Sequence, residues 1–157
     1  MTDSRALISD FIKEWKSVRG KTYEFIATIP DDKMSWKPHE HLGTFGMQLR
    51  HIGVSQRAYV NGMKNGKIDF SDKSYDKELE TDKAKAVAFL KNLDTELIIT
   101  LDSGEYKESI EFHDGVYGVK KASPEKVVGW LMQHETYHQG VLTCYGRLAG
   151  LGKFRMM

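Results

Sequence analysis

The segment 122–150, ASPEKVVGWLMQHETYHQGVLTCYGRLAG, constrains the fold of this chain more than any other stretch. Ser123 is a favourable N-cap, Pro124 suits the first helical position, and Gly150 suits the end of a helix. Its apolar and histidine positions recur in steps of four and three residues, at Val127, Leu131, His134, His138, Val141, Tyr145 and Leu148. A helix with such a heptad seam buries it against other helices. The segment therefore predicts the last helix of a helical bundle.

Three further segments carry apolar residues at helical spacing, which makes four predicted helices. They span residues 4–29, 44–61 and 74–101; the first ends at Pro30 and the second at the turn sequence NGMKNGK. Residues 31–43, DDKMSWKPHEHLG, show no sustained period and are expected to form a loop. Alternating residues around Asp114-Gly115 predict a short β-hairpin. The expected fold is all-α, a single domain over residues 1–157: a four-helix bundle with a long connection before the last helix.

Composition narrows the class of protein and of partner. The chain has 157 residues, with 23 Lys and Arg against 22 Asp and Glu, and these charges are interspersed. A concentrated basic face is absent from the sequence, so nucleic acid is not an expected partner, and neither is a membrane. The single cysteine, Cys144, cannot form an internal disulfide, and the first ten residues lack the apolar core of a signal peptide. We therefore expect a cytoplasmic protein.

His134 and His138 are four residues apart, so on a helix their imidazoles project about 40° apart and one turn displaced. Both can reach one point, which suits a shared metal ion, but a buried polar pair is an equally open interpretation. The residues also spell His-Glu-x-x-His, the motif of zinc peptidases. Such a peptidase needs a third ligand, usually downstream, and residues 139–157 contain no His, Asp or Glu. A zincin-type metallopeptidase is therefore the less favoured hypothesis.

A third metal ligand is expected to come from an upstream segment. The candidates are His39, His41, His51 and His113. The first two lie in the predicted loop and His113 lies beside the predicted turn, where solvated histidines are common. His51 lies on the predicted helix 44–61, along a stripe of small or apolar residues that leaves room for an ion and a small ligand. That stripe consists of Thr44, Met47, Ser55 and Ala58. We therefore expect His51 to complete the site.

The pattern LRHIG on the second helix, followed some eighty residues later by HETYHQG, resembles the DinB-like (DinB/YfiT) family of four-helix-bundle proteins. SWKP before the second helix and YGRLAGLG at the end add to the likeness. The resemblance implies a divalent ion, often nickel or zinc, on His51, His134 and His138. It also implies a homodimer, and for some relatives a transferase or isomerase reaction with a low-molecular-weight thiol. Where the family often has Arg-Gly-Gln after the last His, this chain has Gln139-Gly140-Val141.

Three imidazoles leave at least one coordination position open, which is typical of a catalytic metal site. The open position favours a metal-dependent enzyme that acts on a small-molecule substrate, and the family resemblance implies that its reaction is of the thiol S-transferase or isomerase type. A metal-dependent hydrolase is less favoured. The alternative of a different class is a non-catalytic metal-binding protein, such as a stress-response protein, in which apolar residues close over the ion and leave no cavity.

Other residues near the predicted site have two interpretations each. Glu135 is a candidate catalytic base, but it projects about 100° from His134, so a carboxylate that supports a ligand or faces solvent is as well supported. Tyr59 and Tyr137 are expected either to place hydroxyls in a pocket or to pack. Cys144 projects about 120° from His138 and is expected to serve as a small hydrophobic residue.

Overall fold

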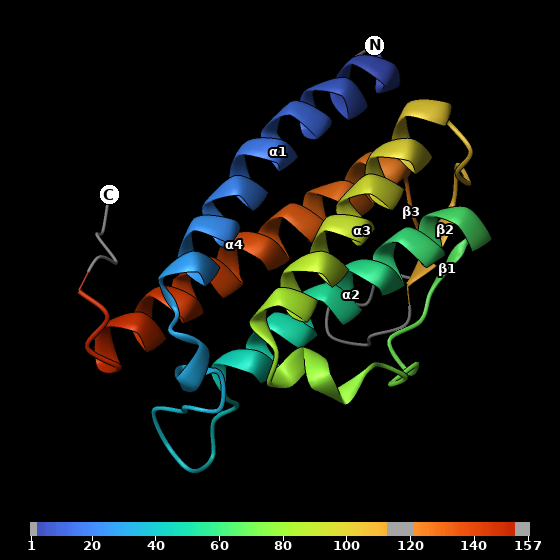
Figure 1. Cartoon of the computed structure of the whole chain (residues 1–157). Coiled ribbons are helices and arrows are strands. Elements are labelled where there is room, and N and C mark those ends of the chain that lie inside the picture. The colour runs from blue at the N-terminus through green and yellow to red at the C-terminus, as the bar shows by residue number, and fades with distance from the viewer. Residues whose placement is uncertain (1–2, 113–120, 153–157) are drawn as a thin grey trace.

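The computed structural model describes residues 3–112 and 121–152. Four long helices run side by side: α1 (Ser4–Thr28), α2 (Phe45–Asn65), α3 (Lys83–Ser103) and α4 (Pro124–Leu148) (Figure 1). Helices α1 and α2 each contact both α3 and α4. The fold is thus the expected mostly helical four-helix bundle. None of the helices within the described ranges is both long and apolar enough to cross a membrane.

A polar side chain caps the N-terminus of each long helix. Asp3, Thr44, Asp82 and Ser123 accept a hydrogen bond from a backbone N–H in the first turn of α1, α2, α3 and α4, respectively. These bonds satisfy donors that a helix leaves unpaired at its start. For α4, this confirms the boundary expected at Ser123 and Pro124.

The predicted end of the second helix is wrong by one turn. Helix α2 continues through Asn61-Gly62 and ends at Asn65, where Gly66 has φ 85°. Gly66 supplies the left-handed conformation that closes a helix. Gly62 instead allows close packing, because a Cβ atom there would lie 2.8 Å from the Cα of Ile68. An Asn-Gly pair occurs at both positions, 61–62 and 65–66, so only tertiary packing determines which of the two pairs ends the helix.

The predicted third helix is two elements. Residues Lys77–Glu80 form a short 3-10 helix, η2, and α3 begins after Asp82. Asp76 caps η2 and Asp82 caps α3, so two N-caps interrupt what the apolar spacing suggested was one helix. The loop before α2 likewise begins with one 3-10 turn, η1 (Asp31–Lys33).

The seam of α4 is buried only in part. Val127, Leu131, His138 and Tyr145 are buried, but Leu148 is 69% exposed and Leu142, outside the predicted seam, is fully buried. A straight helix with 3.6 residues per turn drifts by about 20° per heptad relative to a strict seven-residue repeat. The buried face therefore moves from Val141 to Leu142 toward the C-terminus of the helix.

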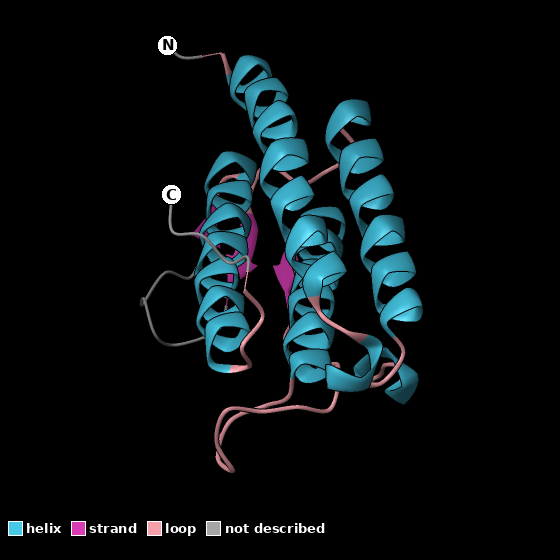
Figure 2. Cartoon of the chain, turned by 60° about the vertical axis from the view of Figure 1, so that its left-hand side comes forward, coloured by secondary structure: helices cyan, strands magenta, loops and turns pink. Residues whose placement is uncertain are grey.

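A small sheet lies against the bundle and completes the fold (Figure 2). Strand β1 (Lys67–Ile68), which the sequence did not predict, pairs in parallel with β2 (Ile110–Phe112), and β2 pairs antiparallel with β3 (Lys121–Ala122). The expected turn at Asp114-Gly115 lies outside the described residues. The register pairs Ile110 with Ala122, whereas a two-residue turn at 114–115 would pair residue 110 with 119. The antiparallel pair is therefore present, in a register that differs from the expected one.

Candidate metal centre

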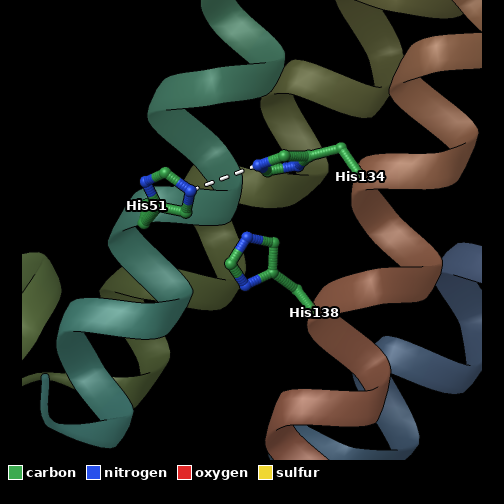
Figure 3. Close-up of side chains that lie close together, drawn as sticks. All are labelled: His51, His134 and His138. Atoms are coloured by element: carbon green, nitrogen blue, oxygen red, sulfur yellow. Dashed lines mark hydrogen bonds between the residues drawn. The ribbon is translucent and has the colours of Figure 1, made fainter. Parts of the chain in front are cut away.

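Three histidines from two helices point toward one another (Figure 3). His138 is buried, His134 is partly buried and His51 is exposed. His51 comes from α2, and His134 and His138 come from successive turns of α4. One ligand nitrogen from each lies within 4.8 Å of the others. The Nε2 atoms of His51 and His134 are 3.2 Å apart, and the ring centroids of the three pairs are separated by 4.5 to 5.1 Å. The structure thus brings together the residues that the sequence proposed as ligands.

Lowered pKa values keep these imidazoles neutral at pH 7. Burial and the neighbouring His138 and His51 lower the pKa of His134 to about 3. Burial and His51 lower the pKa of His138 to about 4. The pKa of His51 is lowered by burial and by the positive charges of Arg50 and Lys73. At neutral pH each ring therefore offers a free lone pair, the form in which histidine binds a metal.

The arrangement fits a divalent ion. Ligand nitrogens at about 2.0 to 2.1 Å from a tetrahedral or octahedral ion lie about 2.8 to 3.4 Å from each other. The 3.2 Å between His51 Nε2 and His134 Nε2 falls in that range. The Nδ1 atoms of His134 and His138 are buried and have no hydrogen-bond partner among the described residues. Neutral imidazoles whose ring nitrogens converge in this way are the form and arrangement in which histidine binds a shared metal ion.

A cavity of about 610 Å³ opens onto this cluster. His51 and His134 line it, whereas His138 does not. Its walls come from α2, α4, strand β2 and the segment 70–75 that follows β1. The apolar side chains that line it are Val54, Ala58, Tyr59, Phe70, Phe112 and Trp130. The cluster is thus accessible to a small molecule from one side.

The sequence model of the DinB family matches residues 1–156. The chain belongs to the DinB family. Among solved structures, the crystal structure of a DinB-like protein from Bacillus subtilis, YjoA, matches with a TM-score of 0.72 at 21% sequence identity. The match covers 94% of this chain and 96% of that chain, and at this identity it supports the fold alone. No curated protein matches the sequence significantly.

In this DinB family protein, Glu135 lies beside α1 and away from the cavity. The side chain is 1% exposed, so a solvent-facing carboxylate is excluded. The hydroxyl of Thr22 donates to its Oε1, and Arg19 Nη2 lies 3.6 Å from its Oε2. Burial raises the pKa of Glu135, while Arg19 and Thr22 oppose that rise. The expected role as a catalytic base has no support in this placement, because Glu135 does not line the cavity.

The hydroxyl of Thr22 makes hydrogen bonds to two successive turns of α4, at Glu135 and Gln139. We call these two bonds the Thr22 contact. Besides donating to Glu135, its hydroxyl accepts a hydrogen bond of 3.0 Å from Gln139 Nε2. Gln139 also donates to the carbonyl of Val18 at 2.6 Å. Glu135 and Gln139 directly follow His134 and His138, so the Thr22 contact on one side of α4 restricts how the two imidazoles on another side are aimed.

A buried polar network that the sequence analysis missed extends this contact to all four helices. Arg19 of α1 is 2% exposed, donates to Gln56 of α2 and lies 3.2 Å from Asp94 of α3. Asp94 also accepts from Trp15 Nε1 at 3.1 Å and from Gln56 Nε2 at 3.0 Å. The signal was present in the first helix: Arg19 and the nearby Thr22 continue the spacing of its apolar stripe, which predicts a buried position.

The remaining candidates lie outside the cluster. His39 and His41 are exposed in the loop before α2, where the backbone N–H of His41 donates to His39 Nδ1. His113 lies outside the described residues. Tyr59 and Tyr137 both line the cavity, and Tyr137 packs edge-on against His138 with ring centroids 5.1 Å apart. Cys144 is exposed, so its expected role as a packed hydrophobic residue is wrong.

Proposed function

We propose that this DinB family protein is a metal-dependent enzyme that transfers a low-molecular-weight thiol to a small electrophile, or isomerises a substrate through such an adduct. The proposed ligands are His51, His134 and His138, and the proposed ion is nickel or zinc. The observation that carries the proposal is the cavity beside the three neutral imidazoles, because His51 and His134 form part of its wall. The resemblance of the sequence to a family that includes thiol transferases supports the choice of reaction.

The residues around the cavity have separate tasks in this proposal. When bound, a divalent ion would supply Lewis-acid activation, which lowers the pKa of a thiol or of water nearby. The neutral imidazoles hold the ion without cancelling its charge. Phe70, Phe112 and Trp130 exclude water from the reacting groups. In the transfer, the thiol proton passes to solvent and a carbon–sulfur bond forms. Either the carbon–halogen bond breaks and halide leaves, or an epoxide carbon–oxygen bond breaks and its oxygen takes up a proton from solvent.

The rival functions are less well supported. In a purely structural or storage site, apolar side chains would cover the histidines, whereas here a cavity reaches two of them. A zinc peptidase places the glutamate of its motif beside the ion as general base. Glu135 is instead bound to Thr22 and Arg19 of α1. Absence of metal-dependent cleavage of a fluorogenic peptide library is therefore the expected result.

The test compares thiol transfer in matched variants. Protein purified without a His tag is analysed for metal, loaded with nickel or zinc, and incubated with bacillithiol, mycothiol or glutathione and a panel of chlorinated and epoxide electrophiles. We expect transfer that is lost in His134→Ala and retained in His39→Ala, since His39 is an exposed histidine outside the cluster. Equal rates in the wild type and His134→Ala with every thiol would contradict the proposal.

The proposal extends to the setting of the enzyme. A small-molecule substrate, a homodimeric state and a cytoplasmic location are proposed from the family resemblance and the composition. The near balance of 23 basic and 22 acidic residues argues against nucleic acid as a partner. Analytical ultracentrifugation tests the oligomeric state, and a mass of one chain at micromolar concentration would contradict it.

A further inference from the structure

Some charged side chains that line the cavity have a partner of opposite charge in the protein, and one does not. Arg50 has a partner, because its Nε lies 3.0 Å from Glu80 and its guanidinium stacks on the ring of Tyr75 at 4.6 Å. Asp72 has one as well, since its carboxylate lies 3.5 Å from Arg57. Lys73 also lines the cavity, and its ammonium has no hydrogen bond or ion pair within residues 3–112 and 121–152. The ammonium of this exposed lysine is therefore a positive charge at the cavity without a protein partner among the described residues.

The segment that carries Lys73 is held in place on both sides of it. Arg57 of α2 binds the Asp72 carboxylate and also donates to the carbonyl oxygen of Ser74. The side chain of Asp72 in turn accepts from the backbone N–H of Ser74 at 2.8 Å. Phe70 anchors the start of the segment, with its ring 5.5 Å from that of Tyr59. This backbone arrangement positions Lys73 at the cavity wall, close enough to lower the pKa of His51.

The same cavity also carries a cluster of aromatic side chains. The ring of Phe112 meets Phe70 edge-on at 5.9 Å and lies 4.9 Å from the ring of Trp130. All three rings line the cavity. Aromatic side chains in such an array favour flat apolar groups, and the few charged groups of a pocket select orientation and specificity.

We propose that the cavity binds a small molecule that combines one carboxylate with a flat apolar group. The carboxylate pairs with Lys73, and the apolar group lies against Phe70, Phe112 and Trp130. This inference rests on the proposed function in that it names the substrate class of the same site. A cationic ligand is disfavoured by the uncompensated ammonium, and a neutral ligand gains nothing from it.

Binding to the metal-free protein tests this inference separately from catalysis. The protein is treated with EDTA at pH 7.5 and titrated with 3-phenylpropionate and with its neutral analogue 3-phenylpropionamide, followed by ¹H–¹⁵N NMR. Without an ion, and with the histidines neutral, the difference between the two probes reports on Lys73. We expect the carboxylate to bind about fivefold more tightly and to shift the indole resonance of Trp130.

Two variants that remove the same charge serve as test and control. Lys73→Met is expected to abolish the preference for the carboxylate, whereas Lys16→Met, at an exposed position of α1, is expected to leave it unchanged. Equal binding of the two probes to the wild type, a preference that survives Lys73→Met, or shifts confined to residues outside the cavity would each overturn the inference. Failure to bind metal would instead contradict the proposed function and leave this result standing.

Discussion

Replacing Thr22 with valine tests whether the Thr22 contact aims the histidines of α4. Thr22 is fully buried, and valine has nearly the same shape, so the change removes the hydroxyl without opening a cavity. Two hydrogen bonds are lost, one to Glu135 and one from Gln139. Gln139 keeps its bond to Val18, whereas Glu135 keeps, among the described residues, only the longer contact to Arg19 at 3.6 Å.

The magnitude follows from these contacts. A hydrogen bond to a charged or buried acceptor contributes about 1.5 to 3 kcal/mol, so the free energy of unfolding is expected to fall by about 2 to 3 kcal/mol. For a domain of this size, that loss lowers the Tm by roughly 5 to 10 °C. Because α4 also loses a restraint on its rotation, we expect the affinity for zinc or nickel to fall about tenfold, as for other residues that orient metal ligands.

Two control variants distinguish an effect on the orientation of His134 and His138 from a general loss of stability. Thr22→Ser keeps the hydroxyl and is expected to restore most of the metal affinity. Thr100→Val removes a buried hydroxyl on α3 that donates only to Glu96 of its own helix. Urea denaturation measures stability, and competition with a chromophoric chelator measures affinity. A Thr22→Val protein with wild-type affinity, or a tenfold loss of affinity in Thr100→Val as well, would refute the reasoning.

Three further predictions follow from the cluster and the fold. His51→Ala is expected to lose the bound ion in elemental analysis, and retention of a full equivalent would show that the ligands are other residues. The pKa values of His134 and His138, about 3 and 4, lie below the ordinary 6.5, so only the unfolded state takes up these protons as pH falls from 6.5 to 4. The metal-free protein should therefore lose stability across this window, by at most ~1.4 kcal/mol per pH unit and histidine, and a flat urea midpoint would argue against buried neutral rings. Gly62→Ala should lower the Tm by several degrees, because the new Cβ would meet Ile68, and an unchanged melting curve would contradict that close packing.

Local rules in the sequence located the four long helices and one pair of the proposed metal ligands. Helix formation depends on spacing and caps within a few residues, so Ser123 and Pro124 marked the start of α4 without knowledge of the rest. The same locality places His134 and His138 one turn apart. In the third predicted helix, the apolar spacing indicated one continuous helix, whereas the N-caps Asp76 and Asp82 begin two separate elements. There the apolar spacing was misleading.

The site as a whole depended on how the helices pack. The stripe around His51 favoured this residue as the third ligand, but its approach to within 3.2 Å of His134 depends on the rotation and offset of α2 against α4, which no local pattern encodes. The placement of Glu135 depends likewise on α1, whose Thr22 lies 113 residues earlier in the chain. The segment that brings Lys73 to the cavity is held by Arg57 of another element. Sequence periodicity determines which face of a helix is buried, and only tertiary packing decides which buried residues meet, because those contacts join positions far apart along the chain.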